Sequence, residues 1–171
     1  MLANVNYIAH HAMQNNRKLK ILVGTMTNTA EYVAQAIEMD CADRANRVDT
    51  VEVLMMDGLD IGIFEEDALY VICTSTYGAG DVPDNAKTLY ESLAMSPRFL
   101  GSVRYGVIAL GDSAYPQTFC HGGQRFDESL RDLGAVRVGA VFRHDASAGT
   151  DAETEGVAWF RQWLPMALDS H

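Results

Sequence analysis

The sequence is poor in cysteine and has no long apolar run. Its three cysteines, Cys41, Cys73 and Cys120, are odd in number and far apart, with no C-x-x-C pair among them. This argues against a disulfide framework and against a cysteine metal site, and it fits a reducing compartment, so we expect a cytoplasmic protein. No apolar run approaches the roughly 20 residues that span a membrane. The N-terminus lacks a charged segment followed by an apolar one, so we expect no signal peptide.

Positive charge is also scarce. The chain has 13 Lys and Arg against 23 Asp and Glu, which gives a formal net charge of −10. Such a surface repels nucleic acid and anionic membranes, and it attracts basic protein partners. We therefore expect no nucleic-acid or membrane partner.

The length and the balance of residue types indicate a single globular domain. The chain has 171 residues, of which 48% are hydrophobic and 21% charged, enough for one domain with a core of its own. We expect this domain to span residues 18–171, after a poorly ordered N-terminal extension over residues 1–17. We also expect the protein to be a monomer.

The apolar pattern predicts strands that alternate with helices. Short apolar runs predict five strands, over residues 18–23, 47–56, 68–75, 103–111 and 135–144. Apolar residues at helical spacing predict four main helices, over residues 28–45, 83–96, 119–134 and 151–168. Because the strands are continuous and apolar, helices should cover both faces of the sheet. The sequence thus predicts an α/β fold: a doubly wound, five-stranded parallel sheet of order 2-1-3-4-5 in a three-layer sandwich.

In such a sheet the ligand lies beyond the carboxyl ends of the strands, at the topological switch point. The loop after the first strand carries hydroxyl side chains and no lysine or arginine; it consists of Thr25, Met26, Thr27, Asn28 and Thr29. Backbone N–H groups at a helix N-terminus attract anions, and hydroxyls add further donors, so this loop suits phosphate. It is neither a Walker A motif nor G-x-G-x-x-G. The alternative is a helix cap without a ligand, with Thr27 or Asn28 as the N-cap residue.

The loops after the third and fourth strands each place a tyrosine at the same edge of the sheet. The former contains Thr76, Tyr77, Gly78, Ala79 and Gly80, and the latter contains Leu110, Gly111, Asp112, Tyr115, Phe119 and Cys120. The glycines allow the backbone to approach a ligand closely. Two tyrosines beside a phosphate-type loop indicate a flat aromatic ligand held between rings and anchored by its phosphate. The alternative is a pair of turns with surface tyrosines.

These loops resemble those of flavodoxins and of the FMN domains of diflavin reductases, including the sulfite reductase flavoprotein. The stretch "GTMTNTAE" is similar to the family's phosphate loop, and "STYGAGDVPDN" and "LGDSAY", followed by "FC", are similar to its two isoalloxazine loops. The resemblance covers residues 18–168. It implies one non-covalent FMN per chain and a role in electron transfer.

The resemblance also implies roles for the loop residues. The five residues from Thr25 to Thr29 would bind the phosphate, and Tyr77 and Tyr115 would stack on opposite faces of the ring. The peptide of Gly78 would present its carbonyl near flavin N5, and Phe119 and Cys120 would lie at the pyrimidine edge. The sequence departs from the family in having Asn28 in place of a glycine. It also has three residues, where flavodoxins often have two, between Tyr115 and Phe119.

Several other functions lack the residues that they require. A response-regulator receiver needs acidic residues after the first and third strands, and a low-molecular-weight phosphatase needs C-x5-R where this chain has "CHGGQR". The G-x-S-x-G nucleophile elbow is absent. Three functions remain open: an electron carrier, a stand-alone NAD(P)H-dependent reductase of quinones or small substrates, and a flavin-free structural or regulatory module.

For the carrier, which has no substrate turnover of its own, we expect an NAD(P)H-dependent flavin reductase as donor and an acceptor enzyme, both basic at the contact. The acids expected to face these partners are Asp81, Asp84 and Asp112, together with Glu65, Glu66 and Asp67.

Overall fold

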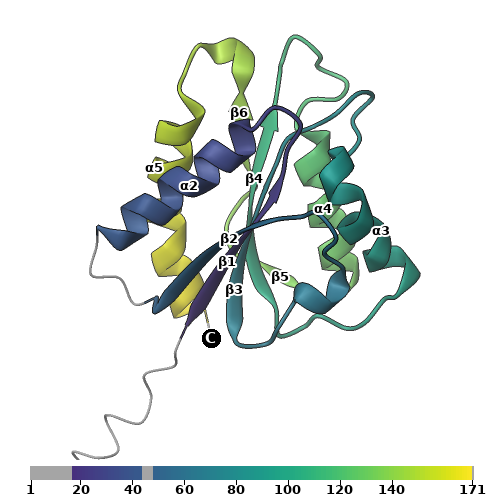
Figure 1. Ribbon diagram of the computed structural model, residues 1–171, viewed down its shortest axis with the longest axis vertical. Helices are drawn as coiled ribbons and strands as arrows, with labels where there is room; N and C mark the ends of the chain where they lie inside the picture. The colour runs from purple at the N-terminus through teal and green to yellow at the C-terminus, as the bar shows by residue number, and fades with distance from the viewer. Residues whose placement is uncertain (1–16, 44–47, 171) are drawn as a thin grey trace, which may run out of the picture.

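The computed structural model describes residues 17–43 and 48–170, which are built around one parallel β-sheet (Figure 1). The predicted extension over residues 1–17 therefore lies outside the described residues, apart from Arg17. The sheet contains β1 (Lys18–Gly24), β2 (Thr50–Met55), β3 (Ala68–Thr74), β4 (Arg104–Gly111), β5 (Val136–Arg137) and β6 (Phe142–Asp145). Its order is β2-β1-β3-β4-β5, with β6 also paired to β4, and every pair is parallel. The predicted parallel sheet of order 2-1-3-4-5 is confirmed.

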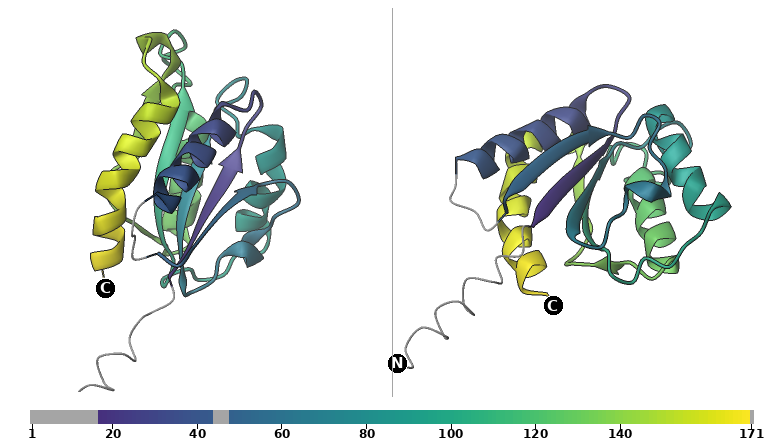
Figure 2. Two further views of the ribbon diagram at one scale, coloured as in Figure 1. Left: turned by 60° about the vertical axis from the view of Figure 1, so that its left-hand side comes forward. Right: turned by 60° about the horizontal axis from the view of Figure 1, so that its bottom comes forward.

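Helices cover both faces of the sheet, as the apolar strands predict. The helices are α2 (Thr29–Ala42), α3 (Lys87–Met95), α4 (His121–Asp132) and α5 (Ala152–Asp169), with short 3-10 turns η1 (Ile61–Ile63), η2 (Asp84–Ala86) and η3 (Ala146–Ala148). α2 and α5 lie on one face, and α3 and α4 lie on the other (Figure 2). Each face has its own apolar core, and all seven residues of β3 are buried because this strand lies in the middle of the sheet.

The fifth strand is not the continuous element that the sequence predicts over residues 135–144. The structure divides it into β5 and β6, which pair with the two ends of β4. Between them Gly139 adopts a left-handed conformation with φ of 70°, and the side chain of Arg137 donates a hydrogen bond to its carbonyl at 3.0 Å. An edge position has a neighbour on one side only, so a local turn of this kind disturbs few hydrogen bonds. β6 then ends at Asp145, beside Gly111.

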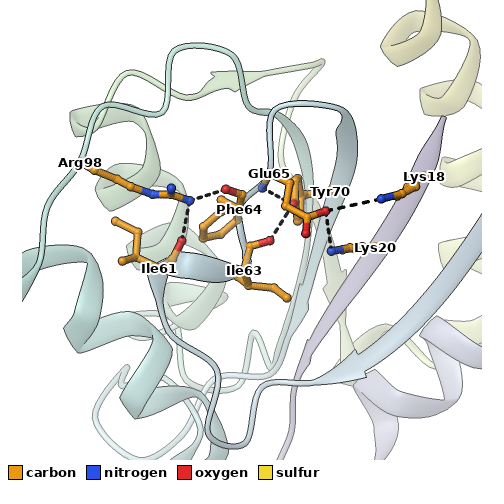
Figure 3. A network of polar contacts seen from close by, with 8 residues as sticks. All are labelled: Lys18, Lys20, Ile61, Ile63, Phe64, Glu65, Tyr70 and Arg98. Carbon is orange, nitrogen blue, oxygen red and sulfur yellow. Dashed lines mark hydrogen bonds and ion pairs between the residues drawn. The ribbon is translucent and has the colours of Figure 1, made fainter. Parts of the chain in front are cut away.

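A polar network holds the connector between β2 and β3 at the amino ends of the strands (Figure 3). The hydroxyl of Tyr70 donates to the carbonyl of Ile63 at 2.8 Å and accepts from the amide of Glu65 at 2.6 Å, while Lys20 pairs with the Glu65 carboxylate at 3.0 Å. Arg98 donates to the carbonyls of Ile61 and Phe64. Burial raises the pKa of Tyr70 to about 12, so its hydroxyl stays protonated and keeps donating.

The position of this connector corrects one expectation about the acidic surface. Residues 65–67 directly precede β3, so they lie at the amino end of that strand. The three loops expected to bind the ligand follow the carboxyl ends of β1, β3 and β4. Glu65, Glu66 and Asp67 are therefore at the opposite edge of the sheet and do not border those loops. The order of elements along the chain already implies this position, because residues that directly precede a parallel strand lie at its amino end.

Candidate functional site

The loop between β1 and α2 exposes a set of unused backbone donors. In the described part of the chain, the N–H groups from Met26 to Glu31 have no hydrogen-bond acceptor, and the first backbone N–H of this helix to find one is that of Tyr32, which donates to Asn28 at 3.0 Å. Asn28 is the N-cap residue of α2, but its side chain makes no capping hydrogen bond. Thr27 and Thr29 are exposed on the same loop. A helix cap without a ligand would use some of these N–H donors. Here the donors are free and lie at the positive end of the helix dipole, so they suit an anion.

Asn28 itself adopts a left-handed conformation, with φ of 66°. Glycine accepts this conformation freely, and asparagine is among the other residues that tolerate it best. Asparagine in the position where the family has glycine therefore leaves the turn of the loop possible.

The same loop contains a buried hydroxyl group that has no hydrogen-bond partner. Thr25 is 9% exposed, and its Oγ1 is the only buried side-chain oxygen or nitrogen of the described residues without a hydrogen bond. A buried polar group without a partner costs about 1–3 kcal/mol, so such groups are rare unless a ligand or water satisfies them. The Thr25 hydroxyl is thus available to a bound group.

Asn85, which the sequence indicated only as part of a helix start, holds this loop in place. Its side-chain oxygen accepts from the amide of Thr25 at 2.9 Å, and its side-chain nitrogen donates to the carbonyl of Val23 at 3.1 Å and to Asp57 at 3.2 Å. One amide side chain therefore connects the loop after β1 with the loops after β2 and β3. No sequence signal identifies this role, because Thr25 and Asn85 are 60 residues apart.

The loop after β3 is a tight turn that presents Tyr77 at the surface. The backbones of Tyr77 and Asp81 exchange two hydrogen bonds of 2.8 Å, and Tyr77 is 44% exposed. Gly78 and Gly80 both have positive φ, at 53° and 94°. A Cβ on Gly80 would lie 3.0 Å from His121, whereas one on Gly78 would meet nothing within 4 Å. The turn thus needs glycine for its backbone conformation and, at Gly80, also for space.

The loop after β4 presents a second exposed tyrosine, because Tyr115 is 68% exposed. Thr76 joins this loop to the previous one: its hydroxyl donates to the carbonyl of Leu110 at 3.1 Å and accepts from the amide of Gly122 at 3.1 Å. Asp112 accepts from the amide of Ala114 at 2.9 Å. The two loops that carry the tyrosines are therefore fixed to each other by hydrogen bonds.

The side chain of Cys120 faces the protein interior. Cys120 is 1% exposed, and its thiol contacts the carbonyls of Ala109 and His144 at 3.3 and 3.7 Å. Burial raises the pKa of this thiol to about 11, so it stays protonated. Only backbone atoms of Cys120 are left to contact a ligand, and Phe119 beside it is partly buried.

A pocket of about 370 Å³ lies between the three loops. Half of the residues predicted for the site line it, namely Thr27, Thr29, Thr76, Gly78, Leu110, Gly111, Asp112 and Tyr115. The other half surround the pocket without lining it, namely Thr25, Met26, Asn28, Tyr77, Ala79, Gly80, Phe119 and Cys120. Four lining residues were not predicted: Ser75, Thr118, His144 and Ala146. Ser75 and Thr118 belong to the loop motifs. His144 lies near the end of β6 and Ala146 directly follows that strand, and no motif in this part of the chain pointed to the pocket.

Residues 21–160 match the protein family described as Flavodoxin. The chain belongs to the flavodoxin family. It is 37% identical to flavodoxin YqcA of Escherichia coli over 147 residues, and the alignment covers 85% of this chain and 95% of that protein. It is also 34% identical to the sulfite reductase [NADPH] flavoprotein alpha-component of Vibrio cholerae over 154 residues, and that alignment covers 89% of this chain and 24% of that protein. A point mutant of the Pseudomonas aeruginosa flavodoxin has a similar structure, with a TM-score of 0.73, 29% identity, and coverage of 88% of this chain and 99% of that chain.

Flavodoxins bind FMN, and this flavodoxin is an FMN-binding electron-transfer protein. The pocket fits that cofactor, because the unpartnered Thr25 hydroxyl and the free N–H groups of the first loop suit a phosphate. Bound FMN supplies a group that accepts and gives up electrons. Within the described ranges, no helix is long and apolar enough to cross a membrane, and no cluster of His, Cys, Asp or Glu side chains suits a metal ion.

Proposed function

We propose that this flavodoxin works as a monomeric cytoplasmic carrier, which takes electrons from an NAD(P)H-dependent flavin reductase and passes them to an acceptor enzyme. The observation that carries the proposal is the size and position of the pocket. Its volume of about 370 Å³ is at the low end for small-molecule sites, which span about 300–1,000 Å³. Tyr77 and Tyr115 stand exposed beside it. Such a site holds one cofactor near the surface, where a partner protein can approach it, and leaves little room for a nicotinamide.

In this proposal the first loop binds the FMN phosphate through backbone N–H groups and through the hydroxyls of Thr25, Thr27 and Thr29. The positive end of the α2 dipole takes the place of a basic side chain. Tyr77 and Tyr115 flank the flavin ring, and the Gly78 peptide lies at one edge of it. The backbone from Leu110 to Asp112, with Phe119 and Cys120, borders the pyrimidine edge, where backbone amides are the donors.

The carrier role predicts that reduction by NAD(P)H needs a second protein. We expect the FMN-loaded protein to stay oxidised for many minutes in anaerobic NADPH alone. A catalytic amount of a ferredoxin- or flavodoxin-type NADP reductase should then bleach the flavin absorbance quickly. The measurement is the visible spectrum over time, with quinones added in a parallel sample. Rapid bleaching by NADPH alone, or quinone turnover without the reductase, would instead support the stand-alone reductase.

Acidic side chains border the pocket, although basic residues offset some of them. Asp81 lies 3.4 Å from Arg125, and Asp84 lies 2.6 Å from Lys87. Asp57, Asp112 and Asp145 also lie at this edge and make no ion pair with lysine or arginine in the described part of the chain. The edge therefore carries a net negative charge, which suits a basic partner.

We expect charge steering at this edge to control the rate of reduction by the reductase. Long-range attraction raises association rates by about 10-fold or more, and at ~0.15 M salt it is screened beyond about 8 Å. The second-order rate, measured by stopped flow, should fall about 10-fold between low and high salt. Asp81→Asn with Asp84→Asn should lower the low-salt rate. The matched control is Glu66→Gln with Asp67→Asn, which removes the same charge at the opposite edge of the sheet. Equal effects of the two double variants would contradict a docking role for this edge.

A further inference from the structure

His144 lies near the end of β6, outside the three loop motifs. Its backbone pairs with Leu110 of β4, and its side chain is 6% exposed. Among the described residues that line the pocket, His144 is the only one with a basic side chain. No motif and no role in the carrier function accounts for a buried histidine at this point.

The orientation of the His144 ring is set by one partner. Its Nδ1 lies 2.7 Å from a carboxylate oxygen of Glu155 on α5, so this nitrogen is the donor in the hydrogen bond. The hydrogen bond from His144 is also the main reason why the pKa of Glu155 is lowered, which keeps the carboxylate ionised as the acceptor. Nε2 has no hydrogen-bond partner in the part of the chain that the structure describes. The ring is 6% exposed and lines the pocket, so Nε2 is the polar atom that it leaves for a bound ligand.

We propose that His144 is an additional FMN-binding residue, whose Nε2 contacts the ribityl phosphate chain. The neutral ring, with its proton on Nδ1, offers Nε2 only as an acceptor, which suits a ribityl hydroxyl. The protonated ring donates from Nε2 as well, which suits an anionic phosphate oxygen and makes the stronger contact. His144 thereby supplies a positive charge that the first loop, with its free N–H groups and hydroxyls, does not contain.

The charged groups around His144 are mostly acidic. Its acidic neighbours are Glu155 on α5, Asp151 at the N-cap of α5 and Asp145 on β6. Hydrogen bonds lower the pKa of each carboxylate, chiefly those from His144 to Glu155, from Thr154 to Asp151 and from Ser113 to Asp145. Asp112 lines the same pocket from the loop after β4. Arg143, the preceding residue, is exposed and is the one basic neighbour in the sequence. The charge around the His144 ring is thus mostly negative.

The sign of the pH dependence follows from this arrangement. A contact between a protonated imidazole and the phosphate is present at low pH and is lost once the ring gives up its proton, and histidine side chains in general change charge between about pH 5 and 8. The phosphate monoester of FMN has its own second ionisation near pH 6, which changes affinity in every variant. The informative quantity is therefore the ratio of the dissociation constants of a variant and the wild-type protein at each pH, in which the ionisation of free FMN cancels.

The test is a set of FMN titrations of the apoprotein between pH 5.5 and pH 8.5, followed by quenching of flavin fluorescence. His144→Gln keeps a polar side chain that cannot be charged, and His144→Phe keeps a ring without a polar atom. We expect His144→Phe to weaken FMN binding about 10-fold or more at pH 5.5, the size of a hydrogen bond to a charged group, and clearly less at pH 8.5. His144→Gln should be closer to wild type at pH 8.5 than at pH 5.5. Thermal unfolding of each apoprotein shows whether the variants are folded.

Three further arms make the result specific. Glu155→Gln removes the charged partner that orients the ring and should weaken FMN binding, whereas Glu153→Gln on the same helix should leave it unchanged. Riboflavin lacks the phosphate, so a pH-dependent loss seen with FMN and not with riboflavin assigns the contact to the phosphate. A loss seen with both ligands assigns it to the ribityl hydroxyls. Variant-to-wild-type ratios that stay near one, or that are the same at every pH in folded His144 variants, would overturn the proposal.

Discussion

FMN binding is expected to weaken by about 100-fold or more when Thr27 and Thr29 are both replaced by alanine. Both residues line the pocket at the free N-terminus of α2. A hydrogen bond to a charged group is worth about 1.5–3 kcal/mol, and each 1.36 kcal/mol changes an equilibrium constant about 10-fold. Both side chains are exposed in the loop, so the substitutions remove ligand contacts without opening a cavity in the core. The measurement is the dissociation constant of FMN from the apoprotein at neutral pH.

Two controls separate loss of the phosphate contact from general damage to the protein. Thr88→Ala removes an exposed threonine from α3, outside the pocket, and should leave FMN affinity unchanged. Riboflavin, which lacks the phosphate, should bind the double variant and the wild-type protein with similar affinity. A double variant that keeps the wild-type affinity for FMN would show that the phosphate is bound elsewhere.

Gly122→Ala is expected to lower the free energy of unfolding by about 1–3 kcal/mol and to weaken FMN binding as well. Gly122 lies in the first turn of α4, and a Cβ there would stand 2.3 Å from the carbonyl oxygen of Ser75 and 3.2 Å from the Cα of Thr76. These are backbone atoms, so no side chain can rotate away. The helix and the loop after β3 would have to separate, and the hydrogen bond from the Gly122 amide to the Thr76 hydroxyl would lengthen or break.

The matched control is Gly149→Ala, because a Cβ at Gly149 meets no atom within 4 Å. Its φ of 72° makes alanine unfavourable by about 1–2 kcal/mol, but Gly149 lies after η3 and does not line the pocket. Chemical denaturation of both apoproteins and FMN titration give the comparison. Gly149→Ala should reduce stability alone, whereas Gly122→Ala should reduce both stability and affinity. Unaltered FMN affinity in Gly122→Ala would mean that contact between α4 and the loop after β3 does not shape the site.

The fold could be read from the sequence because its signals are local. The run from Ala68 to Thr74 is apolar at nearly every position, and a strand of that kind must be covered on both faces, as β3 is. Strands of this type alternating with helices leave few possible sheet orders once crossovers are right-handed. The fifth strand was predicted less well, because the turn at Gly139 depends on the edge position and on Arg137, not on the apolar pattern.

Part of the site could be predicted for the same reason. Thr27 and Thr29 come directly before a helix, and Tyr115 follows a buried strand, so position along the chain already brings them to one edge of the sheet. The roles of Asn85 and His144 could not be found in this way. Asn85 acts on Thr25, and His144 reaches the pocket from the edge of the sheet; both contacts join residues that no local pattern relates.

By itself, then, the sequence determined the sheet, its order, the covering helices and the three loops that border the pocket, because each follows from runs of fewer than about 20 residues. Tertiary structure alone decided that the Thr25 hydroxyl is buried without a partner and that a histidine held by Glu155 joins the pocket. The physical reason is that burial, hydrogen bonding and the direction of a charge are set by neighbours in space, and packing brings those neighbours together from distant parts of the chain.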